Sequence, residues 1–373
     1  TVKLSCETKE ISAAVGAASK VVNAHTTVPI LSNVLIQAEN GSVSVRATDL
    51  ELTLEQRVKA EIEEPGSITV PAKLFAGYLA NLTQTSKLDL SGTPNRVSVK
   101  CERTNYDFNA LPGEEYPPLP AAVKGAQFSL SGKRLREGID AVIFAAATEE
   151  ARGAVMMGTL LEIEGDKLTM VATDGYRLAR YETTLDESPG GHERFIVPSR
   201  ALAETARNLS GAERVSVNVL GAQNNQLQFS AENAAVTVRL VDGQYPNYQQ
   251  VIPAKFDRKI TASVPALVGA LRRAELVAGD RASMVKMNLS NHTLIVTANS
   301  ERSGNAYEEI EIEQEGDDLT IAFNARYMIE VLNHVKSAQC RIEFVGPLSP
   351  AALTPAESTE GASQLYVLMP LRQ

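Results

Sequence analysis

The sequence of 373 residues has no tryptophan, and aromatic residues make up only 5% of it, so a stacking platform for single-stranded nucleic acid is not expected. Its three cysteines, Cys6, Cys101 and Cys340, are odd in number and lack a Cys-x-x-Cys pair. This pattern argues against a disulfide framework or a zinc site and favours a reducing cytoplasm. No run of about 18 apolar residues occurs, and the first residues lack a signal-peptide pattern, so no membrane partner is expected.

Catalytic and metal-binding motifs are missing too. The sequence has no Gly-x4-Gly-Lys-Ser/Thr loop, no His-Glu-x-x-His and no Gly-x-Ser-x-Gly elbow. The four histidines, His25, His192, His292 and His334, show no ligand spacing. We therefore expect no catalytic residue, no metal and no cofactor. The net charge of −9 disfavours nonspecific nucleic-acid binding unless cations gather on one face.

What the sequence does contain is an internal repeat. Asp49, Asp174 and Asn299 lie in similar segments and are 125 residues apart. Two more anchor segments recur in the same order: 70–74, 197–201 and 323–327, then 111–117 and 241–246, with 369–371 closing the last copy. Anchors in one order at a near-constant offset predict three tandem copies of one unit.

Each copy has the same predicted order of elements. A short strand opens each copy, at 2–6, 127–130 and 259–262. An amphipathic helix follows, at about 8–22, 132–147 and 264–279. A second helix starts after Pro71, Pro198 or at Asn324, and runs over about 72–82, 199–210 and 325–336. Alternating strands separate the helices, and hairpin-like strands close the copy, for example at 215–219, 227–230 and 236–240. Two helices with many antiparallel strands predict the α+β class.

Connectors rich in proline and glycine, about 116–125 and 245–255, mark the domain boundaries. We expect domains at 1–120, 121–250 and 251–373. The stretch 347–363, rich in Ser, Pro, Ala and Glu, is expected to be a loop.

Positive charge is concentrated on the predicted helices. The six helical segments, counted as 7–22, 72–87, 133–147, 199–210, 265–279 and 324–336, carry +6. The rest of the chain therefore carries −15, since the whole carries −9. If the helices share a face, that face can hold DNA through its phosphates without reading sequence. The alternative is that lysine and arginine on helices serve solubility.

Five segments together resemble the bacterial DNA polymerase III β subunit, a DNA sliding clamp. They are 28–33 (VPILSN), 172–179 (ATDGYRLA), 242–248 (DGQYPNY), 323–327 (FNARY) and 368–372 (LMPLR). The resemblance covers the whole chain, and 172–179 and the C-terminal segment are its most specific parts. It implies a non-catalytic processivity factor.

The resemblance implies three clamp domains per chain and a head-to-tail homodimer that closes a ring around double-stranded DNA. Helices line the hole of such a ring, and closure retains the DNA without a tight grip. The cations expected to face DNA are Lys20, His25, Lys73, Arg134, Arg136, Arg152, Arg200, Arg207 and Lys336. Many relatives have an arginine at the position of His25.

The resemblance also implies a hydrophobic cleft between the second and third domains. Such a cleft takes short peptides from the polymerase III α subunit, the clamp loader, other polymerases and repair proteins. The matching residues are Met156, Thr173, Gly175, Tyr176, Arg177, Leu178, Pro246, Val251, Val367, Leu368, Met369, Pro370, Leu371 and Arg372. Arg177 is expected to hold a polar group of the peptide, and 347–355 to overhang the cleft. Many relatives have an arginine where Gln250 stands.

The ring interface should pair an edge strand of the first domain with one of the third. The matching residues are Tyr78, Arg103, Tyr106, Leu276, Val277, Glu308 and Glu309. Arg103 is expected to pair with Glu308 or Glu309.

Two alternatives stay open from the residues alone. One is a three-domain β-rich scaffold or binding protein with an unknown ligand. The other is a hydrolase that uses Asp49 or Asp174 as a catalytic carboxylate. The asparagine at position 299 counts against the hydrolase, because Asp or Asn after a strand more often completes a turn.

Overall fold

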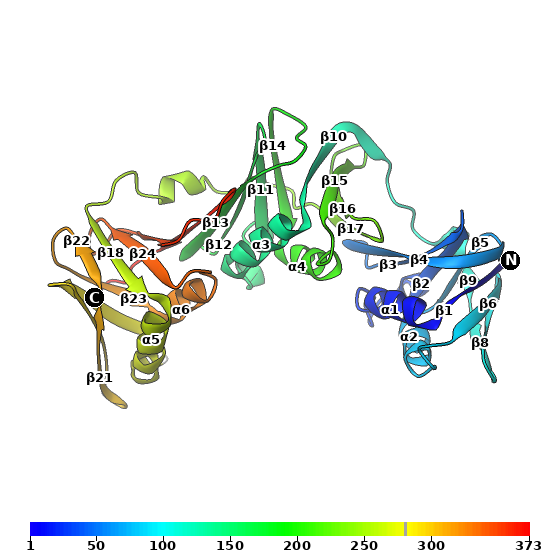
Figure 1. The fold of residues 1–373 in the computed structure, drawn as a ribbon, viewed down its shortest axis with the longest axis horizontal. Helices are drawn as coiled ribbons and strands as arrows, with labels where there is room; N and C mark the ends of the chain where they lie inside the picture. The colour runs from blue at the N-terminus through cyan, green and yellow to red at the C-terminus, as the bar shows by residue number, and fades with distance from the viewer. Residues whose placement is uncertain (280–281) are drawn as a thin grey trace. The chain divides into compact units, whose positions relative to one another are not determined.

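The computed structural model describes residues 1–279 and 282–373, the side chains of residues 125 and 126 excepted. The described residues divide into two compact units. Their helices and strands are labelled in Figure 1. The first unit comprises Thr1–Lys133 and Glu204–Leu240, and the second comprises Arg134–Ala203 and Val241–Gln373.

The first unit contains one 13-stranded antiparallel sheet and the helices α1 (Thr8–Ser19) and α2 (Ala72–Ala80), which pack together. Its main strand order is β10-β15-β16-β17-β4-β1-β6-β7-β8, and β2, β3, β5 and β9 branch from this path. The strands are β1 (Val2–Glu7), β2 (Asn33–Glu39), β3 (Ser42–Thr48), β4 (Leu52–Glu64), β5 (Gly66–Pro71), β6 (Lys87–Thr93), β7 (Arg96–Cys101), β8 (Thr104–Asn109), β9 (Leu111–Pro112), β10 (Ala122–Ser131), β15 (Arg214–Leu220), β16 (Gln226–Ser230) and β17 (Ala234–Arg239).

The second unit contains a nine-stranded sheet, ordered β14-β11-β12-β13-β26-β25-β24-β18-β22, and a four-stranded sheet, ordered β21-β20-β19-β23. The strands are β11 (Gly158–Glu164), β12 (Lys167–Thr173), β13 (Arg177–Thr184), β14 (His192–Pro198), β18 (Arg258–Ser263), β19 (Met284–Ser290), β20 (Thr293–Ser300), β21 (Gly304–Glu311), β22 (Glu313–Glu315), β23 (Leu319–Asn324), β24 (Gln339–Phe344), β25 (Ala351–Pro355) and β26 (Ala362–Leu368). Its helices are α5 (Val264–Ala278) and α6 (Ala325–Asn333), with parts of α3 (Gly132–Val142) and α4 (Ser199–Asn208). Short 3-10 turns include η3 (Ile143–Ala145), η4 (Glu150–Arg152) and η5 (Tyr248–Val251).

Helix α5 shows how the sequence pattern builds the core. Its buried residues, among them Leu267, Ala270, Leu271 and Ala274, recur at helical spacing and face β20 and β21. Burying one such leucine contributes about 1.5–3 kcal/mol. Ser263 accepts a hydrogen bond from the Ala266 amide and caps the helix.

All six helices begin at the predicted residue, but five end two to five residues early. In α1, the Ser19 hydroxyl donates to the Gly16 carbonyl (2.8 Å), which is a side-chain bond that competes with the helix ladder. Helix α3 tightens into η3 at Ile143. The predicted asparagine cap is confirmed, because Asn324 accepts from the amides of Arg326 (3.0 Å) and Tyr327 (3.3 Å).

The prediction of a loop over 347–363 is wrong for residues 351–355, which form β25, and for residues 362–363, which begin β26. Ala351, Ala352 and Leu353 are buried, and β25 pairs with β24 and β26. Composition alone misses such a strand, because its small apolar residues are stabilised by neighbours on both sides. Lys87, counted with a helix from the sequence, lies in β6.

The repeat is visible in how neighbouring copies join. Strand β4 of the first copy pairs with β17 of the second, and β13 of the second copy pairs with β26 of the third. In each junction, the last strand of a hairpin joins the strand that follows the Asp49 or Asp174 turn. The corresponding strands β8 and β21 are edge strands with one described neighbour each. One edge of β8 and one edge of β21 therefore have no strand partner among the described residues.

No helix in the described ranges is long and apolar enough to cross a membrane. Within those ranges, no group of three or more His, Cys, Asp or Glu side chains could hold a metal ion.

Candidate functional site

The turn between β12 and β13 is organised by Asp174. Its Oδ1 accepts from the amides of Tyr176 (2.9 Å) and Arg177 (3.0 Å). The Thr173 hydroxyl accepts from the Gly175 amide (3.1 Å) and donates to the Arg177 carbonyl (2.6 Å). Gly175 has φ +87, a left-handed conformation that glycine adopts without strain. The turn is therefore a rigid platform from which residues 176 and 177 project.

Asp49 has the same role in the first unit. Its Oδ1 accepts from the amides of Glu51 (2.9 Å) and Leu52 (2.7 Å). A carboxylate that accepts hydrogen bonds from turn amides in this way stabilises the backbone of the turn. These contacts argue against the hydrolase alternative for both aspartates.

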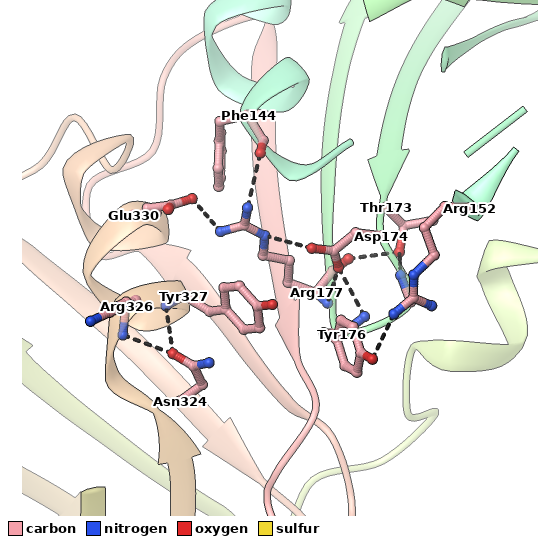
Figure 2. A network of polar contacts seen from close by, with 11 residues as sticks. Phe144, Arg152, Thr173, Asp174, Tyr176, Arg177, Asn324, Arg326, Tyr327 and Glu330 are labelled. Atoms are coloured by element: carbon pink, nitrogen blue, oxygen red, sulfur yellow. Dashed lines mark hydrogen bonds and ion pairs between the residues drawn. The ribbon is translucent and has the colours of Figure 1, made fainter. Parts of the chain in front are cut away.

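Arg177 is buried and bridges three segments of the second unit (Figure 2). Its Nε donates to Asp174 Oδ2 (3.2 Å), one terminal nitrogen donates to the Phe144 carbonyl (3.1 Å), and the other pairs with Glu330 of α6. Its guanidinium also lies over the Tyr327 ring, 4.5 Å from the centroid. Three of its five N–H groups are thus engaged, so its main contacts are within the protein.

Tyr176 stands at the exposed side of the turn, with 47% of its surface accessible. Arg152 donates to its hydroxyl (2.6 Å) and covers its ring, and the Tyr327 ring is stacked at 6.0 Å (Figure 2). Arg152, expected to face DNA, therefore lies beside the predicted cleft.

The C-terminal segment lies along the same turn. Strand β26 pairs with β13, so that Val367 faces Leu178 and Leu368 faces Arg177. The Met369 amide then donates to the Tyr176 carbonyl (3.0 Å). Met369 is 38% exposed. The structure thus brings the two most specific motifs of the sequence together.

A buried apolar cluster underlies this surface. It combines Leu178 and Val367, which were predicted, with others that sequence reasoning missed: Leu160, Val171, Ile196, Tyr245 and Tyr248, with Val155, Val241, Ile252 and Leu365 packed against them. Tyr248 donates to Glu162 (2.8 Å), and burial raises the pKa of its hydroxyl to about 12. The signal for Tyr245 and Tyr248 was their place in the segment 242–248 next to Pro246.

The remaining predicted cleft residues differ in accessibility. Pro246 and Arg372 are exposed, and Val251 is 37% exposed. Met156, Pro370 and Leu371 are half-buried, and the Leu371 amide donates to the Ala322 carbonyl (2.8 Å). Exposed apolar side chains over an apolar floor can bind a short peptide without enzymatic chemistry.

The cations expected to face DNA fall into two groups. Several are held by protein partners: Arg134 by Glu137 (2.9 Å) and the Glu360 carbonyl, Arg136 by Asp140 (3.9 Å) and Arg207 by Glu204 (2.9 Å). Lys20, His25, Lys73, Arg200 and Lys336 are exposed or at the rim of a groove. With the observed bounds, the six helices carry +4 rather than +6, because Lys87 and Lys336 lie outside them; Lys20 and Glu7 also lie outside α1, and their charges cancel.

The predicted interface residues lie on the two free edges. On the first unit, Tyr106 of β8 is 53% exposed, and its ring lies 4.7 Å from that of Tyr78; Arg103 precedes the strand and is exposed. On the second unit, Leu276 of α5 is 81% exposed, whereas Val277 is half-buried.

Strand β21 already has its own polar contacts. Glu308 pairs with Arg273 (2.6 Å), which lowers the pKa of Glu308, and Glu309 accepts from the Tyr307 hydroxyl (2.6 Å). A bond from Arg103 would therefore compete with Arg273 for Glu308. Tyr307, which is 62% exposed on this edge, was not predicted as an interface residue. Its position as an isolated tyrosine among acidic residues of an alternating strand could have indicated it.

Comparison with known proteins gives a consistent result. Profiles described as the N-terminal, central and C-terminal domains of the DNA polymerase III beta subunit match residues 2–120, 129–247 and 249–372. The chain is 31% identical over 353 residues to the beta sliding clamp of Pseudomonas aeruginosa, covering 94% of this chain and 95% of that protein. It is 31% identical over 376 residues to the beta sliding clamp of Caulobacter vibrioides, covering 99% and 100%.

Solved structures agree. The sliding clamp of Pseudomonas aeruginosa bound to griselimycin has a TM-score of 0.93 at 29% identity, with both chains fully covered. That of Bartonella birtlesii, also bound to griselimycin, has a TM-score of 0.90 at 32% identity, again over both full chains.

These matches extend over the three copies and both anchor motifs of the site. They make the protein a DNA sliding clamp, a non-catalytic processivity subunit, and they disfavour the scaffold and hydrolase alternatives. The chain belongs to the DNA polymerase III beta subunit family.

Proposed function

We propose that two copies of this chain close head to tail into a ring that encircles duplex DNA. The observation that carries this proposal is the pairing rule of the repeat. Two of three equivalent junctions are made within the chain, by β4 with β17 and by β13 with β26. The third junction needs β8 of one copy and β21 of another.

The side chains on these edges support the pairing. Tyr106 on β8 and both Tyr307 and Leu276 on the other edge are among the most exposed large apolar residues of the described chain. Exposed apolar residues on an unpaired strand mark an interface. Charge adds an attraction at one end of the edge, where Glu308 or Glu309 of β21 would meet Arg103, whereas β8 itself carries Asp107 and no cation.

In this ring the nine predicted cations would face the DNA. Their positive charge would attract the phosphates regardless of base sequence. Lys20, Lys73, Arg200 and Lys336 are the strongest candidates, because none of them has an ion-pair partner among the described residues. Arg152 is the weakest, since it is bound to Tyr176.

The cleft residues would bind short peptides of polymerases, including the polymerase III α subunit, and of the clamp loader and repair proteins. Support comes from Tyr176, Val251 and Met369, which are exposed above the apolar cluster. A Caulobacter crescentus relative is described with polyethylene glycol bound at its proposed β-motif tethering region. In this assignment Arg177 positions the turn and does not itself take the peptide's polar group.

We further place the three clamp domains at 1–120, 121–250 and 251–373, following the repeat. A cytoplasmic site of action fits the three cysteines, which are buried and free.

The test is topological. The protein is loaded by its clamp loader on nicked circular DNA, and retention is measured by gel filtration before and after linearisation. A ring stays on the circle and slides off the linear form. Retention that is indifferent to the cut, or a monomeric mass in solution, would contradict the ring.

A separate test addresses the cleft. Met369→Ala, or removal of 369–373, should abolish binding of a labelled clamp-loader peptide while the dimer mass stays unchanged. Retained peptide affinity would refute the cleft assignment and leave the ring untouched.

A further inference from the structure

A groove of about 610 Å³ lies in the second unit, close to the cleft network. It is lined by the end of α3 with η3, the first turn of α4, and the segment after α6. Phe144, Arg200, His334 and Lys336 are among its lining residues.

The charge of the groove favours an anion. Its acidic residues are already paired, Glu137 with Arg134 (2.9 Å) and Asp140 with Arg136 (3.9 Å). Arg200 and Lys336 have no such partner in the described chain. Two unpaired cations in a concave, partly apolar surface are suited to a phosphate group.

Two lining residues connect the groove to Arg177. The rings of Phe144 and His334 stack at 3.9 Å, and His334 Nδ1 is 2.7 Å from the Glu330 carbonyl. Arg177 donates to the Phe144 carbonyl and pairs with the Glu330 carboxylate, as Figure 2 shows. One buried side chain therefore joins both walls of the groove to the turn that carries Tyr176.

We propose that this groove binds a backbone phosphate of duplex DNA, and that its occupancy raises the affinity of the cleft for its peptide. The proposal rests on the sliding-clamp function and adds a link between its two binding surfaces. A phosphate held by Arg200 and Lys336 would immobilise η3 and the end of α6. Arg177 contacts both segments, so the bound phosphate would favour the arrangement seen here, in which the Arg177 network is intact and the turn presents Tyr176 to the peptide.

The experiment measures the Kd of a fluorescein-labelled peptide containing Gln, Leu and Phe by anisotropy, on the intact dimer, with and without a short blunt duplex. We expect the duplex to tighten peptide binding about fivefold, the low end of typical couplings. Linkage requires the peptide to tighten duplex binding by the same factor. An unchanged peptide Kd on the wild-type protein would overturn the proposal.

Variants test phosphate binding in the groove separately from its coupling to the cleft. In Arg200→Gln/Lys336→Gln the duplex should no longer change the peptide Kd, and the salt slope of duplex binding should fall by about 2. Glu330→Gln should abolish the coupling without changing that slope, and Glu330→Asp should restore part of it. Coupling that survives in either Gln variant would contradict the assignment.

The matched control is Arg326→Gln, on the same helix as Glu330. Arg326 pairs with Glu275 of α5 (2.5 Å). It should keep the fivefold effect, and loss of coupling here would show that any change in α6 suffices. If the peptide fails to bind even without duplex, the proposed function fails instead.

Discussion

The two junctions inside the chain use the same backbone pairing but differ in their side chains. The first pairs residues 52–56 with 234–238, and its polar contacts include Arg239 with Glu51 (3.7 Å), an exposed pair. The second pairs 177–183 with 362–368 and adds the buried Arg177 network and a bond from Thr183 to the Gly361 carbonyl (2.9 Å). The repeat determines where copies join, and the departures from it lie where we propose the peptide cleft.

The turns at the two junctions show where the copies agree and where they differ. Leu50 and Gly175 occupy the same left-handed position, at φ +77 and +87. Leu52 of the first turn corresponds to Arg177 of the second. The Tyr116 hydroxyl accepts from the Thr48 amide (3.1 Å), whereas the corresponding Tyr245 hydroxyl faces the Thr173 amide without a hydrogen bond of proper geometry among the described residues. Both turns are held by their own aspartate and threonine, and the second also contacts α6 through Arg177 and Glu330.

Alkaline pH should have the largest effect and should separate the two units. Burial raises the pKa of Tyr181, Tyr248 and Tyr116 to about 12, and that of Tyr245 and Tyr366 further. Because these folded-state pKa values exceed those of the unfolded chain, this stability is complete below about pH 10 and is lost as the pH rises towards 12. Four of the five tyrosines lie in the second unit, so hydrogen exchange should show it opening first. If the first unit opened at a lower pH than the second, the proposed difference between the two units would be contradicted.

Arg177→Ala should come next, since it leaves Asp174 without its charged partner. We expect a loss of about 3 kcal/mol, the lower end for breaking a buried pair. The control Leu52→Ala, at the matching half-buried position, should cost about 1 kcal/mol. Hydrogen exchange of the β13 and β26 amides, compared with β4 and β17, measures both. Equal losses would remove the distinction between the junctions.

Tyr116→Phe should cost about 1–2 kcal/mol, because the buried Thr48 amide loses its acceptor. Tyr245→Phe should be nearly neutral, since its hydroxyl makes no hydrogen bond of proper geometry within the described chain. Urea unfolding of both variants checks the pair. A larger loss of unfolding free energy for Tyr245→Phe than for Tyr116→Phe would show that the second turn depends on its tyrosine hydroxyl as the first does.

The smallest effect should come from exchanging the left-handed residues. Leu50→Gly should stabilise by up to about 1 kcal/mol by removing strain, and Gly175→Ala should destabilise by about 1 kcal/mol. At Gly175 the nearest atom to an added Cβ is an Arg152 nitrogen at 3.9 Å, so the cost is conformational and not steric. Shifts of the thermal midpoint in opposite directions would confirm this.

The sequence predicts the helix starts well because local chemistry defines them: Pro71, Pro198 and Asn324 precede or cap the first turn. Helix ends are less predictable, since local bonds such as that from Ser19 to Gly16 compete closely with the helix ladder and small differences decide where the ladder stops. Strand β25 was missed because its stability comes from neighbours on both sides.

For the site, the motifs located the turn and the C-terminal segment, but not what holds them. The role of Arg177 depends on Glu330 and Phe144, which are far from it in sequence and belong to no motif. Tyr248 and Val155 were likewise missed, because an apolar floor has no signature beyond hydrophobicity. Such contacts are set by tertiary packing, which periodicity does not encode.

The unlike edges β8 and β21 have a consequence for direction. A contact between two different patches relates the copies by rotation about the axis of the hole, so the two faces of a closed ring are not equivalent. Both copies of the Tyr176 turn would then open on the same face. Such a ring has a front and a back on DNA, and every peptide-tethered partner would approach from the same side.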